Sequence, residues 1–503
     1  MFPPPRTFRY PALAAENAQA LASRAAAAQD GGMDLLQTSA CELARDIATR
    51  RLSAADLMAA TLDRIAALNP THNAIVALRP REALLAEARA ADAAESRGPL
   101  HGLPLAVKDL EDVAGLPTTK GSPLLRQIPA ADSLMVSRLR AAGAIIIGKT
   151  NVPELTLGSY SRNPVYGVTR NAYDARLSAG GSSSGAAVAL ALRMVALADG
   201  SDVGGSLRNP AGWNNVYGFR PSFGRIPRAD ADVWTPTLGV LGPMARSVED
   251  LALMLSVQAG FSYGAPLSLP GDGAAFHPAP PPQSRGLRIA WLGDFGGAIP
   301  YDPGVLELAR SAMRVFEDLG CVVEESQPDF AFAPLWRAFL KLRHWHNAPL
   351  LPLYEDPASR ALLPEAAIYE IENGLKLTAY DVAAASQTRS HWHAALAQFH
   401  QRYDFWALPT AQCFAFPAEA RGAAQIGGRR MATYHEWMQC AVPATMAGAP
   451  ALALPAGFDA QGRAMGVQLV GRVQDETAVL ALARAYDEAT RWPYRRPPDA
   501  LAG

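Results

Sequence analysis

Residues 202–208 read Asp202-Val203-Gly204-Gly205-Ser206-Leu207-Arg208, in which a serine follows two glycines. A second run lies upstream, Gly180-Gly181-Ser182-Ser183-Ser184-Gly185, and its Ser182 stands 24 residues before Ser206. An isolated lysine, Lys108, lies 74 residues before Ser182. A serine nucleophile must hand its proton to a positioned base, and lysine is the base in one variant of the serine triad. The three residues therefore meet the chemical requirements of amide-bond hydrolysis, with no histidine in their motifs.

The two glycines before Ser206 bear on how a substrate carbonyl could be held. Glycine adopts positive φ angles at little cost and lets a ligand approach the backbone closely. Consecutive N–H groups can then face a developing oxyanion. The candidate donors are Val203, Gly204, Gly205 and Ser206. The alternative interpretation is a tight turn between a strand and a helix, and the presence of Lys108 and Ser182 favours the oxyanion site over it.

Lys108 closes the apolar run Leu103–Val107, which predicts a buried strand. A lysine at the end of a strand is usually a solvated cation. To act as a base it must be neutral, so burial has to lower its pKa from about 10.4 toward the working pH. Asp109 is a candidate counter-ion that would oppose this shift, and we assign it no catalytic role.

Further motifs stand in a fixed order around these residues. They are Gly102 to Asp109, Thr118-Thr119 with Gly121-Ser122, Gly148 to Glu154, Gly180 to Ser183, Gly204 to Pro210, Asp404 to Thr410, and Gly466 to Gly471. The ordered set spans roughly residues 38–490 and resembles the amidase signature family. The resemblance implies that family's α/β fold, in which one large, mostly parallel (mixed) β-sheet is covered by helices on both faces.

The resemblance also implies a role for each matching residue. Ser206 corresponds to the nucleophile and Lys108 to the base. Ser182 corresponds to a serine that follows a cis peptide bond and relays protons between the other two. Ser183 corresponds to a serine that supports this network by hydrogen bonding.

Other positions in the two serine runs have structural interpretations. Asp202 and Arg208 flank the nucleophile and are expected to brace the turn through hydrogen bonds and charge. Without the resemblance, Ser182 would be interpreted as a helix N-cap. Ser184 and Ala179 stand where the family commonly has glycine and proline, respectively.

The residues after the nucleophile indicate a branch of the family. The family often has aromatic-Cys-Gly and then Gly-Leu-Lys-Pro-Thr, whereas this chain has Trp213-Asn214-Asn215 and then Gly218-Phe219-Arg220-Pro221-Ser222. This variation is similar to the branch that contains cyclic-amide (nylon-oligomer) hydrolases and other amidases of broad range. It is less similar to the subunit of the amidotransferases that uses glutamine.

Two other kinds of site receive less support. The run Gly180–Gly185 could cradle a phosphate, but it lacks both common glycine-rich phosphate motifs. The pairs His344/His346 and His391/His393 lie in stretches that look helical and carry no cysteine or carboxylate cluster, so we expect no metal. Cofactors are not expected either.

Composition limits the partners and the location of the chain. Of its 503 residues 49% are hydrophobic and 18% charged, and the formal net charge is −1. A net charge this close to zero gives no excess of positive charge that would indicate binding to nucleic acid or to an acidic membrane. No stretch of about eighteen uncharged apolar residues occurs, so no transmembrane helix is expected. The four cysteines form no paired motif, which fits a cytoplasmic location. The oligomeric state is not determined by the sequence, and a homodimer is one possibility.

The chain is expected to form one domain over residues 33–495. Residues 1–32 are interpreted as an N-terminal leader or arm without catalytic duty, and residues 496–503 as a tail. Within the domain, strand and helix patterns alternate, which favours a mostly parallel sheet. The stretch 330–403 is helical and aromatic, and the resemblance implies that it walls the substrate funnel.

Local signals predict individual elements. Ser53 with Asp56 indicates a capping box for a helix that ends at Asn69-Pro70, and Gly98 is expected to cap a helix over residues 81–97. Helices are expected at 134–142 and 186–192. Strands are expected at 103–107, 144–147, 194–198, 287–292, 321–324, 405–408, 451–454 and 467–470.

Three hypotheses about function follow. The first is an amidase that cleaves small-molecule carboxylic amides, and also esters or carbamates, through a serine acyl-enzyme. The second is the A-type subunit of a glutamine amidotransferase, which acts with partner subunits in tRNA-dependent amidation. The third is a non-catalytic scaffold of the same fold.

Overall fold

The computed structural model describes residues 35–94, 98–229, 232–235 and 237–501. In these residues eleven strands form one mixed sheet, which confirms the predicted α/β class with a single sheet at its core. In sheet order the strands are β1 (Ile75–Val76), β3 (Ile145–Thr150), β2 (Pro104–Lys108), β6 (Leu197–Asp202), β8 (Val240–Ala245), β7 (Tyr217–Arg220), β14 (Ala451–Phe458), β15 (Ala464–Val470), β11 (Phe405–Pro409), β9 (Arg288–Trp291) and β10 (Val322–Glu325).

Strand directions divide the sheet into three parts. At one end, strands β3, β2 and β6 pair in parallel and the edge strand β1 pairs antiparallel with β3, and at the other end β11, β9 and β10 pair in parallel. The strands between them pair antiparallel, from β6 through β8, β7, β14 and β15 to β11. Antiparallel neighbours can be joined by a short loop such as residues 459–463 between β14 and β15, whereas parallel neighbours need a crossover.

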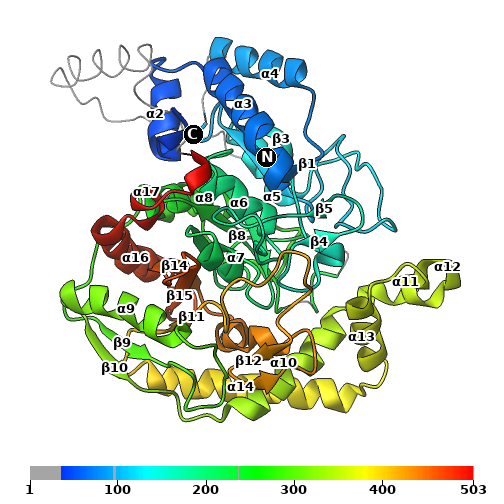
Figure 1. The fold of residues 1–503 in the computed structure, drawn as a ribbon, viewed down its shortest axis with the longest axis vertical. Helices are drawn as coiled ribbons and strands as arrows, with labels where there is room; N and C mark the ends of the chain where they lie inside the picture. Colours follow the sequence, from blue (N-terminus) through cyan, green and yellow to red (C-terminus); the bar gives the residue numbers. More distant parts are fainter. Residues whose placement is uncertain (1–34, 95–97, 230–231, 236, 502–503) are drawn as a thin grey trace.

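Helices cover both faces of the sheet (Figure 1). On one face α8 (Val248–Gln258) and α9 (Val305–Asp318) flank α16 (Glu476–Thr490), which contacts both. Helices α6 (Ser184–Ala191) and α7 (Arg208–Trp213) contact each other and pack on the opposite face. All eight residues of α6 are buried, and a helix that is apolar on every side is suited to such a position. The two serine runs thus lead into two adjacent helices in the core.

A group of helices extends along the bottom of Figure 1 and up its right-hand side. It comprises α10 (Phe332–His346), α11 (Leu351–Glu355), α12 (Pro357–Arg360), α13 (Glu365–Gly374) and α14 (Ala379–Phe399). Helix α10 packs against α14, α13 and α15 (Val442–Ala447). The remaining helices are α2 (Ala40–Ala48), α3 (Ala54–His72), α4 (Arg81–Ala93), α5 (Leu134–Ala141) and α17 (Trp492–Arg495).

Three local predictions differ from the structure. Helix α3 continues through Pro70 to His72, although Pro70 has no N–H to donate, and Asn73 then ends it in the left-handed conformation (φ 50°). Helix α4 ends at Ala93, so Gly98 does not cap it. Strand β6 begins at Leu197, three residues later than expected, after a turn in which Arg193 has φ 54°.

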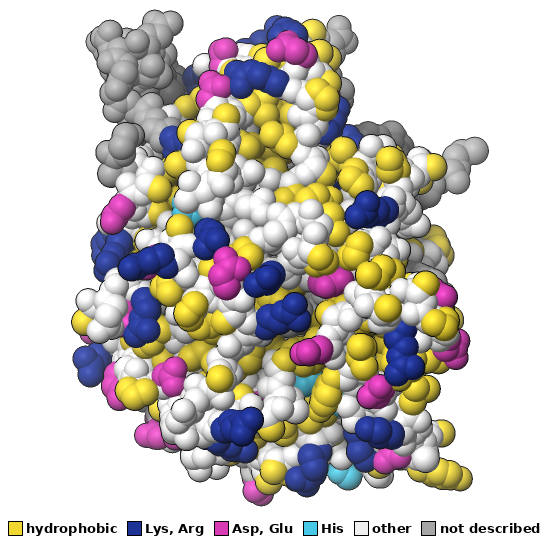
Figure 2. Space-filling view, turned by 45° about the vertical axis from the view of Figure 1, so that its right-hand side comes forward, with side chains coloured by type: hydrophobic (Ala, Val, Ile, Leu, Met, Phe, Trp, Pro, Cys, Tyr) yellow, Lys and Arg dark blue, Asp and Glu magenta, His cyan; other side chains and the backbone are white. Residues whose placement is uncertain are grey.

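The predicted leader, residues 1–32, lies outside the described residues. No helix in the described part of the chain combines the length and the apolar character that a membrane span requires. Figure 2 shows basic and acidic side chains interspersed with hydrophobic ones across one face, so no charge of a single sign dominates it.

Gly212 in α7 allows the helix to approach β15 and the end of β11. A Cβ atom at this position would lie 2.2 Å from Thr410 Oγ1 and 3.0 Å from the backbone nitrogen of Gly466.

We therefore predict that Gly212→Ala destabilises the protein by roughly 1–3 kcal/mol through overpacking, measured as a lower midpoint of urea denaturation. Gly264→Ala is the control, since its Cβ would meet Ala229 Cβ at 3.6 Å; an equal shift for both variants would contradict the packing argument.

Candidate active site

Ser206 lies in the turn that joins β6 to α7. Gly205 has a φ of +98°, a region that favours glycine, so the expected positive φ occurs directly before the serine. A Cβ atom on Gly205 would also lie 2.9 Å from the Cβ of Ala441. Both constraints require glycine at this position and determine how the serine is presented.

Lys108 closes β2, as the sequence predicts, and its side chain is fully buried. Its Nζ atom lies 2.9 Å from Ser182 Oγ, 2.9 Å from Ser183 Oγ and 2.8 Å from Ser201 Oγ. It also lies 3.5 Å from the carbonyl oxygen of Ser201. The structure thus brings the lysine and the upstream serine run together, although 74 residues separate Lys108 from Ser182.

Burial lowers the pKa of Lys108 to about 7. The charges of Asp199 and Asp202 act in the opposite direction, but desolvation outweighs them. Asp199 is itself buried and accepts a hydrogen bond from the backbone N–H of Lys108 at 2.9 Å. Burial raises the pKa of Asp199 to about 7, which weakens its negative charge near neutral pH. Lys108 is therefore an amine that can be neutral at physiological pH.

The exposed fractions of these side chains decide which of them a substrate can reach. Ser206 is 9% exposed, whereas Ser182 is 2% exposed and Lys108 is not exposed at all. The peptide bond between Gly181 and Ser182 is cis, as the resemblance implies. The N–H of Ser183 donates to the carbonyl oxygen of Ser206 at 3.2 Å, so the two serine runs are in direct contact.

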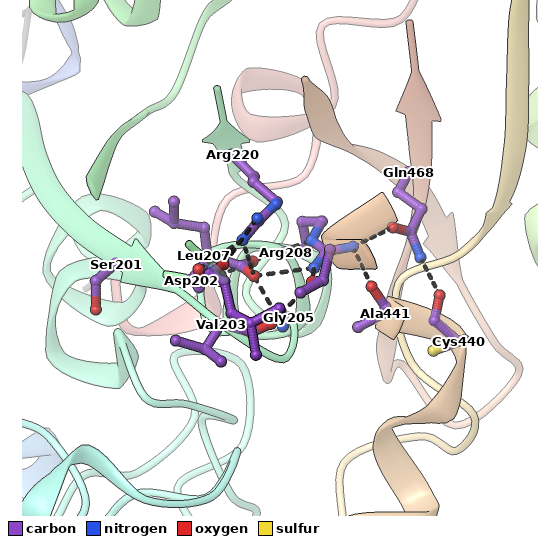
Figure 3. Close-up of polar contacts among 12 residues, drawn as sticks. Ser201, Asp202, Val203, Gly205, Leu207, Arg208, Arg220, Cys440, Ala441 and Gln468 are labelled. Carbon is purple, nitrogen blue, oxygen red and sulfur yellow. Dashed lines mark hydrogen bonds and ion pairs between the residues drawn. The ribbon is translucent and has the colours of Figure 1, made fainter. Parts of the chain in front are cut away.

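A buried ion cluster lies beneath the turn (Figure 3). The carboxylate of Asp202 accepts hydrogen bonds from Arg208 at 2.9 and 3.0 Å and from the backbone N–H groups of Gly205 and Leu207. Arg220 donates to the carbonyl of Asp202 at 2.6 Å and to its carboxylate at 3.2 Å. Although burial acts to raise the pKa of Asp202, the charges of Arg208 and Arg220 hold it below the ordinary value.

Arg208 also ties the turn to the C-terminal part of the sheet (Figure 3). Its guanidinium donates to Gln468 Oε1 at 2.6 Å, to the carbonyl of Ala441 at 3.0 Å and to Thr445 Oγ1 at 3.0 Å. Thr445 in turn donates to the carbonyl of Val203 at 2.8 Å. The structural interpretation of Asp202 and Arg208 thus agrees with their contacts.

The same cluster bears on the predicted oxyanion donors. The N–H of Gly205 donates a hydrogen bond to Asp202 Oδ1 at 3.0 Å. It is therefore not free to donate to an oxyanion in this structure. The N–H groups that stay candidates for an oxyanion are those of Val203, Gly204 and Ser206.

Asp109 does not pair with the lysine beside it. It is buried, accepts a hydrogen bond from the backbone N–H of Thr119 at 3.1 Å, and lies 3.6 Å from Lys149 Nζ. Because the charge of Asp109 is balanced by Lys149, it does not hold Lys108 in the protonated form. These contacts agree with a structural rather than a catalytic interpretation of Asp109.

Sequence reasoning missed several residues of the site. They are Ser201, Asp199, Lys149, Arg220, Thr445 and Gln468. Lys149 and Gln468 fall within the motifs that carry the family resemblance, Ser201 directly precedes Asp202, and Arg220 lies in the segment that departs from the family pattern. Position within or beside a motif does not reveal a contact.

Of the histidines considered for a metal site, His344 is bonded to a carboxylate instead. His344 Nδ1 lies 2.6 Å from Glu370, which also lies 2.7 Å from His435 Nε2 and accepts a hydrogen bond from Arg343. Among the residues that the structure describes, no group of three or more potential metal-ligating side chains is found.

Comparison with known proteins agrees with this geometry. Residues 56–480 match the family model described as Amidase. Because this match covers most of the chain, the protein belongs to the amidase family, whose members include the amidase signature enzymes that the sequence resembles. It is an amide-hydrolysing enzyme of that family.

Individual relatives match over nearly their whole length. An acylamidase of Rhodococcus erythropolis is 33% identical, over 92% of this chain and 98% of the relative. The A-type subunit of the glutamyl-tRNA(Gln) amidotransferase of Moorella thermoacetica is also 33% identical, over 93% of this chain and all of the relative. Two solved structures are similar: a bacterial aryl acylamidase (TM-score 0.83, 27% identity, 93% of this chain and 98% of that one) and a 6-aminohexanoate cyclic dimer hydrolase (TM-score 0.80, 25% identity, 93% and 100%).

The ion cluster around Asp202 yields a stability prediction. Asp202→Asn keeps the shape of the side chain but leaves Arg208 and Arg220 without a balancing charge, which should cost about 3–5 kcal/mol at neutral pH. Urea denaturation measures the loss. Asp63→Asn, which removes an exposed ion pair with Arg81 at 2.7 Å, is the control and should shift the midpoint little. Equal shifts for the two variants would contradict a structural role of the cluster.

Proposed function

We propose that the protein hydrolyses carboxylic amides through an acyl-enzyme on Ser206. Lys108 is the base, Ser182 relays protons between Lys108 and Ser206, and Ser183 supports the relay. Asp202 and Arg208 hold the turn that carries the nucleophile.

One observation carries this proposal more than any other. The Nζ atom of Lys108 is buried, lies 2.9 Å from Ser182 Oγ and has a pKa lowered to about 7. A general base is most effective when its pKa lies near the working pH. A lysine that served only to balance charge would instead be expected to have a carboxylate within ion-pair distance.

The proposed reaction begins with attack of Ser206 Oγ on the carbonyl carbon of the amide. The proton of Ser206 passes to Ser182, whose own hydroxyl proton passes to the neutral amine of Lys108. The negative oxygen of the tetrahedral intermediate accepts hydrogen bonds from the N–H groups of Val203, Gly204 and Ser206. The relay then runs backwards and protonates the leaving nitrogen as the C–N bond breaks. Water attacks the remaining acyl-enzyme by the same route and releases the carboxylic acid.

Esters and carbamates are proposed as further substrates, because they pass through a similar tetrahedral intermediate. The likeness to proteins named acylamidase and cyclic dimer hydrolase supports amides other than glutamine as substrates. The likeness to the A-type amidotransferase chain supports the second candidate, release of ammonia from glutamine in a complex with partner subunits.

The pKa of Lys108 yields a pH prediction. Only the neutral amine accepts a proton, and the folded-state pKa lies well below the ordinary value. Activity should therefore rise with pH through about 7 and level off above it. The check is the pH profile of kcat/KM on an uncharged amide; a profile that stays flat from pH 5 to 9 would exclude Lys108 as the base.

Substitutions test the proposed roles directly. Lys108→Ala and Ser182→Ala should each lower kcat/KM by roughly 10²–10⁴-fold, because each removes general acid–base catalysis. Ser206→Ala should abolish both turnover and labelling by a fluorophosphonate probe. The assay is a panel of aliphatic, aryl and cyclic amides, esters, carbamates and glutamine.

The panel also separates the hypotheses. Turnover of non-glutamine amides by the isolated chain would discard the amidotransferase hypothesis. If the folded protein neither turns over a substrate nor reacts with the probe, the scaffold is favoured. Near-native turnover by both relay variants would show that the proposed relay is wrong.

A further inference from the structure

One side of the turn that carries Ser206 faces helix α10. A Cβ atom placed on Gly204 would meet one atom within 4 Å among the described residues outside its own chain neighbours, Cζ of Phe339 at 3.8 Å. The backbone next to Ser206 therefore faces an aromatic ring of α10, with room for a methyl group between them. Phe339 is 2% exposed and stacks with Trp336 at a centroid distance of 5.7 Å, so its position is held by packing.

His346 lies two helical turns after Phe339. Residues seven apart share one face of an α-helix and are separated by about 10 Å along its axis. A Cβ atom placed on Gly239 would lie 3.2 Å from Val203 Cγ2 and 3.7 Å from His346 Cε1. Val203 precedes Gly204, and Val240, which follows Gly239, pairs with Asp202 in the sheet. The face of α10 that bears Phe339 and His346 thus runs along the turn that carries the nucleophile.

The imidazole of His346 differs from those of its neighbours in its bonding. His344 and His435 both contact Glu370, at 2.6 and 2.7 Å. Nδ1 of His346 is buried and has no hydrogen-bond partner among the described residues; Nδ1 of His435 is also unpaired, but His435 contacts Glu370 through Nε2. Burial, together with the charges of Arg343 and Arg228, lowers the pKa of His346 to about 4, so the ring is neutral at physiological pH. A neutral imidazole offers one N–H donor and one nitrogen acceptor.

A polar atom that is buried without a partner costs free energy, which a ligand can repay by bonding to it. We propose that His346 is a substrate-binding residue that determines specificity: it forms a hydrogen bond with a second polar group of the substrate, while Phe339 contacts the apolar segment that joins this group to the scissile amide. The substrate class is therefore an extended amide with a remote hydroxyl or carbonyl group. This inference rests on the proposed amidase function.

The test compares matched substrates. Straight-chain para-nitroanilides, at several chain lengths, are assayed beside the same compounds with a terminal hydroxyl group. The wild-type enzyme should prefer the hydroxyl-bearing substrate at one or more lengths. His346→Phe, which keeps a ring but no hydrogen-bonding atom, should reduce this preference by about five- to a hundredfold, mainly through KM. His346→Gln should restore part of it.

His393→Ala is the matched control, because His393 is an exposed histidine of α14 and should leave the preference unchanged. The role proposed for His346 would be overturned if His346→Phe retained the preference, or if the wild-type enzyme cleaved both substrates equally at every length. Neither result would overturn the proposed amidase function. Failure of the wild-type enzyme to cleave any amide in the panel would overturn the proposed function and this inference with it.

Discussion

The burial of one amine is the constraint on which the site depends. Lys108 Nζ is surrounded by the hydroxyls of Ser182, Ser183 and Ser201 at 2.8–2.9 Å, in a place that water does not reach. Taking a cation out of water is costly, so the pKa falls to about 7. The nearby Asp109 is paired with Lys149, and burial raises the pKa of Asp199 to about 7, which weakens its negative charge near neutral pH. The neighbouring carboxylates therefore do not cancel the effect of burial on Lys108.

A second buried cluster braces the turn that carries Ser206, the proposed nucleophile. Asp202 binds the guanidinium groups of Arg208 and Arg220 as well as two backbone N–H groups of the turn. Arg208 continues to Gln468 in β15 and to Ala441. The turn at the end of β6 is thereby attached to a strand residue that lies 260 positions after Arg208 in the chain. Removing one member would leave a buried charge unbalanced, which links the stability of the site to that of the sheet.

Much of the fold could be predicted from hydrophobic runs. The strands expected at 103–107, 405–408 and 467–470 occur as β2, β11 and β15 with small shifts in their ends. Boundaries failed where local signals compete with tertiary packing, as at Pro70 inside α3 and at the start of β6. The antiparallel centre of the sheet could not be foreseen, because alternation of apolar runs does not specify which strands pair.

For the proposed site, the sequence alone identified the candidate reactive side chains, Lys108, Ser182 and Ser206, because their chemistry and their order in the motifs are local properties. Only the tertiary structure decided what each side chain meets. Burial lowers the pKa of Lys108, and the ion pair with Lys149 balances the charge of Asp109. The carboxylate of Asp202 accepts a hydrogen bond from the N–H of Gly205. The position of α10, which brings Phe339 and His346 alongside the turn, was likewise settled by packing between distant segments, since no local pattern records which helix face will cover a strand.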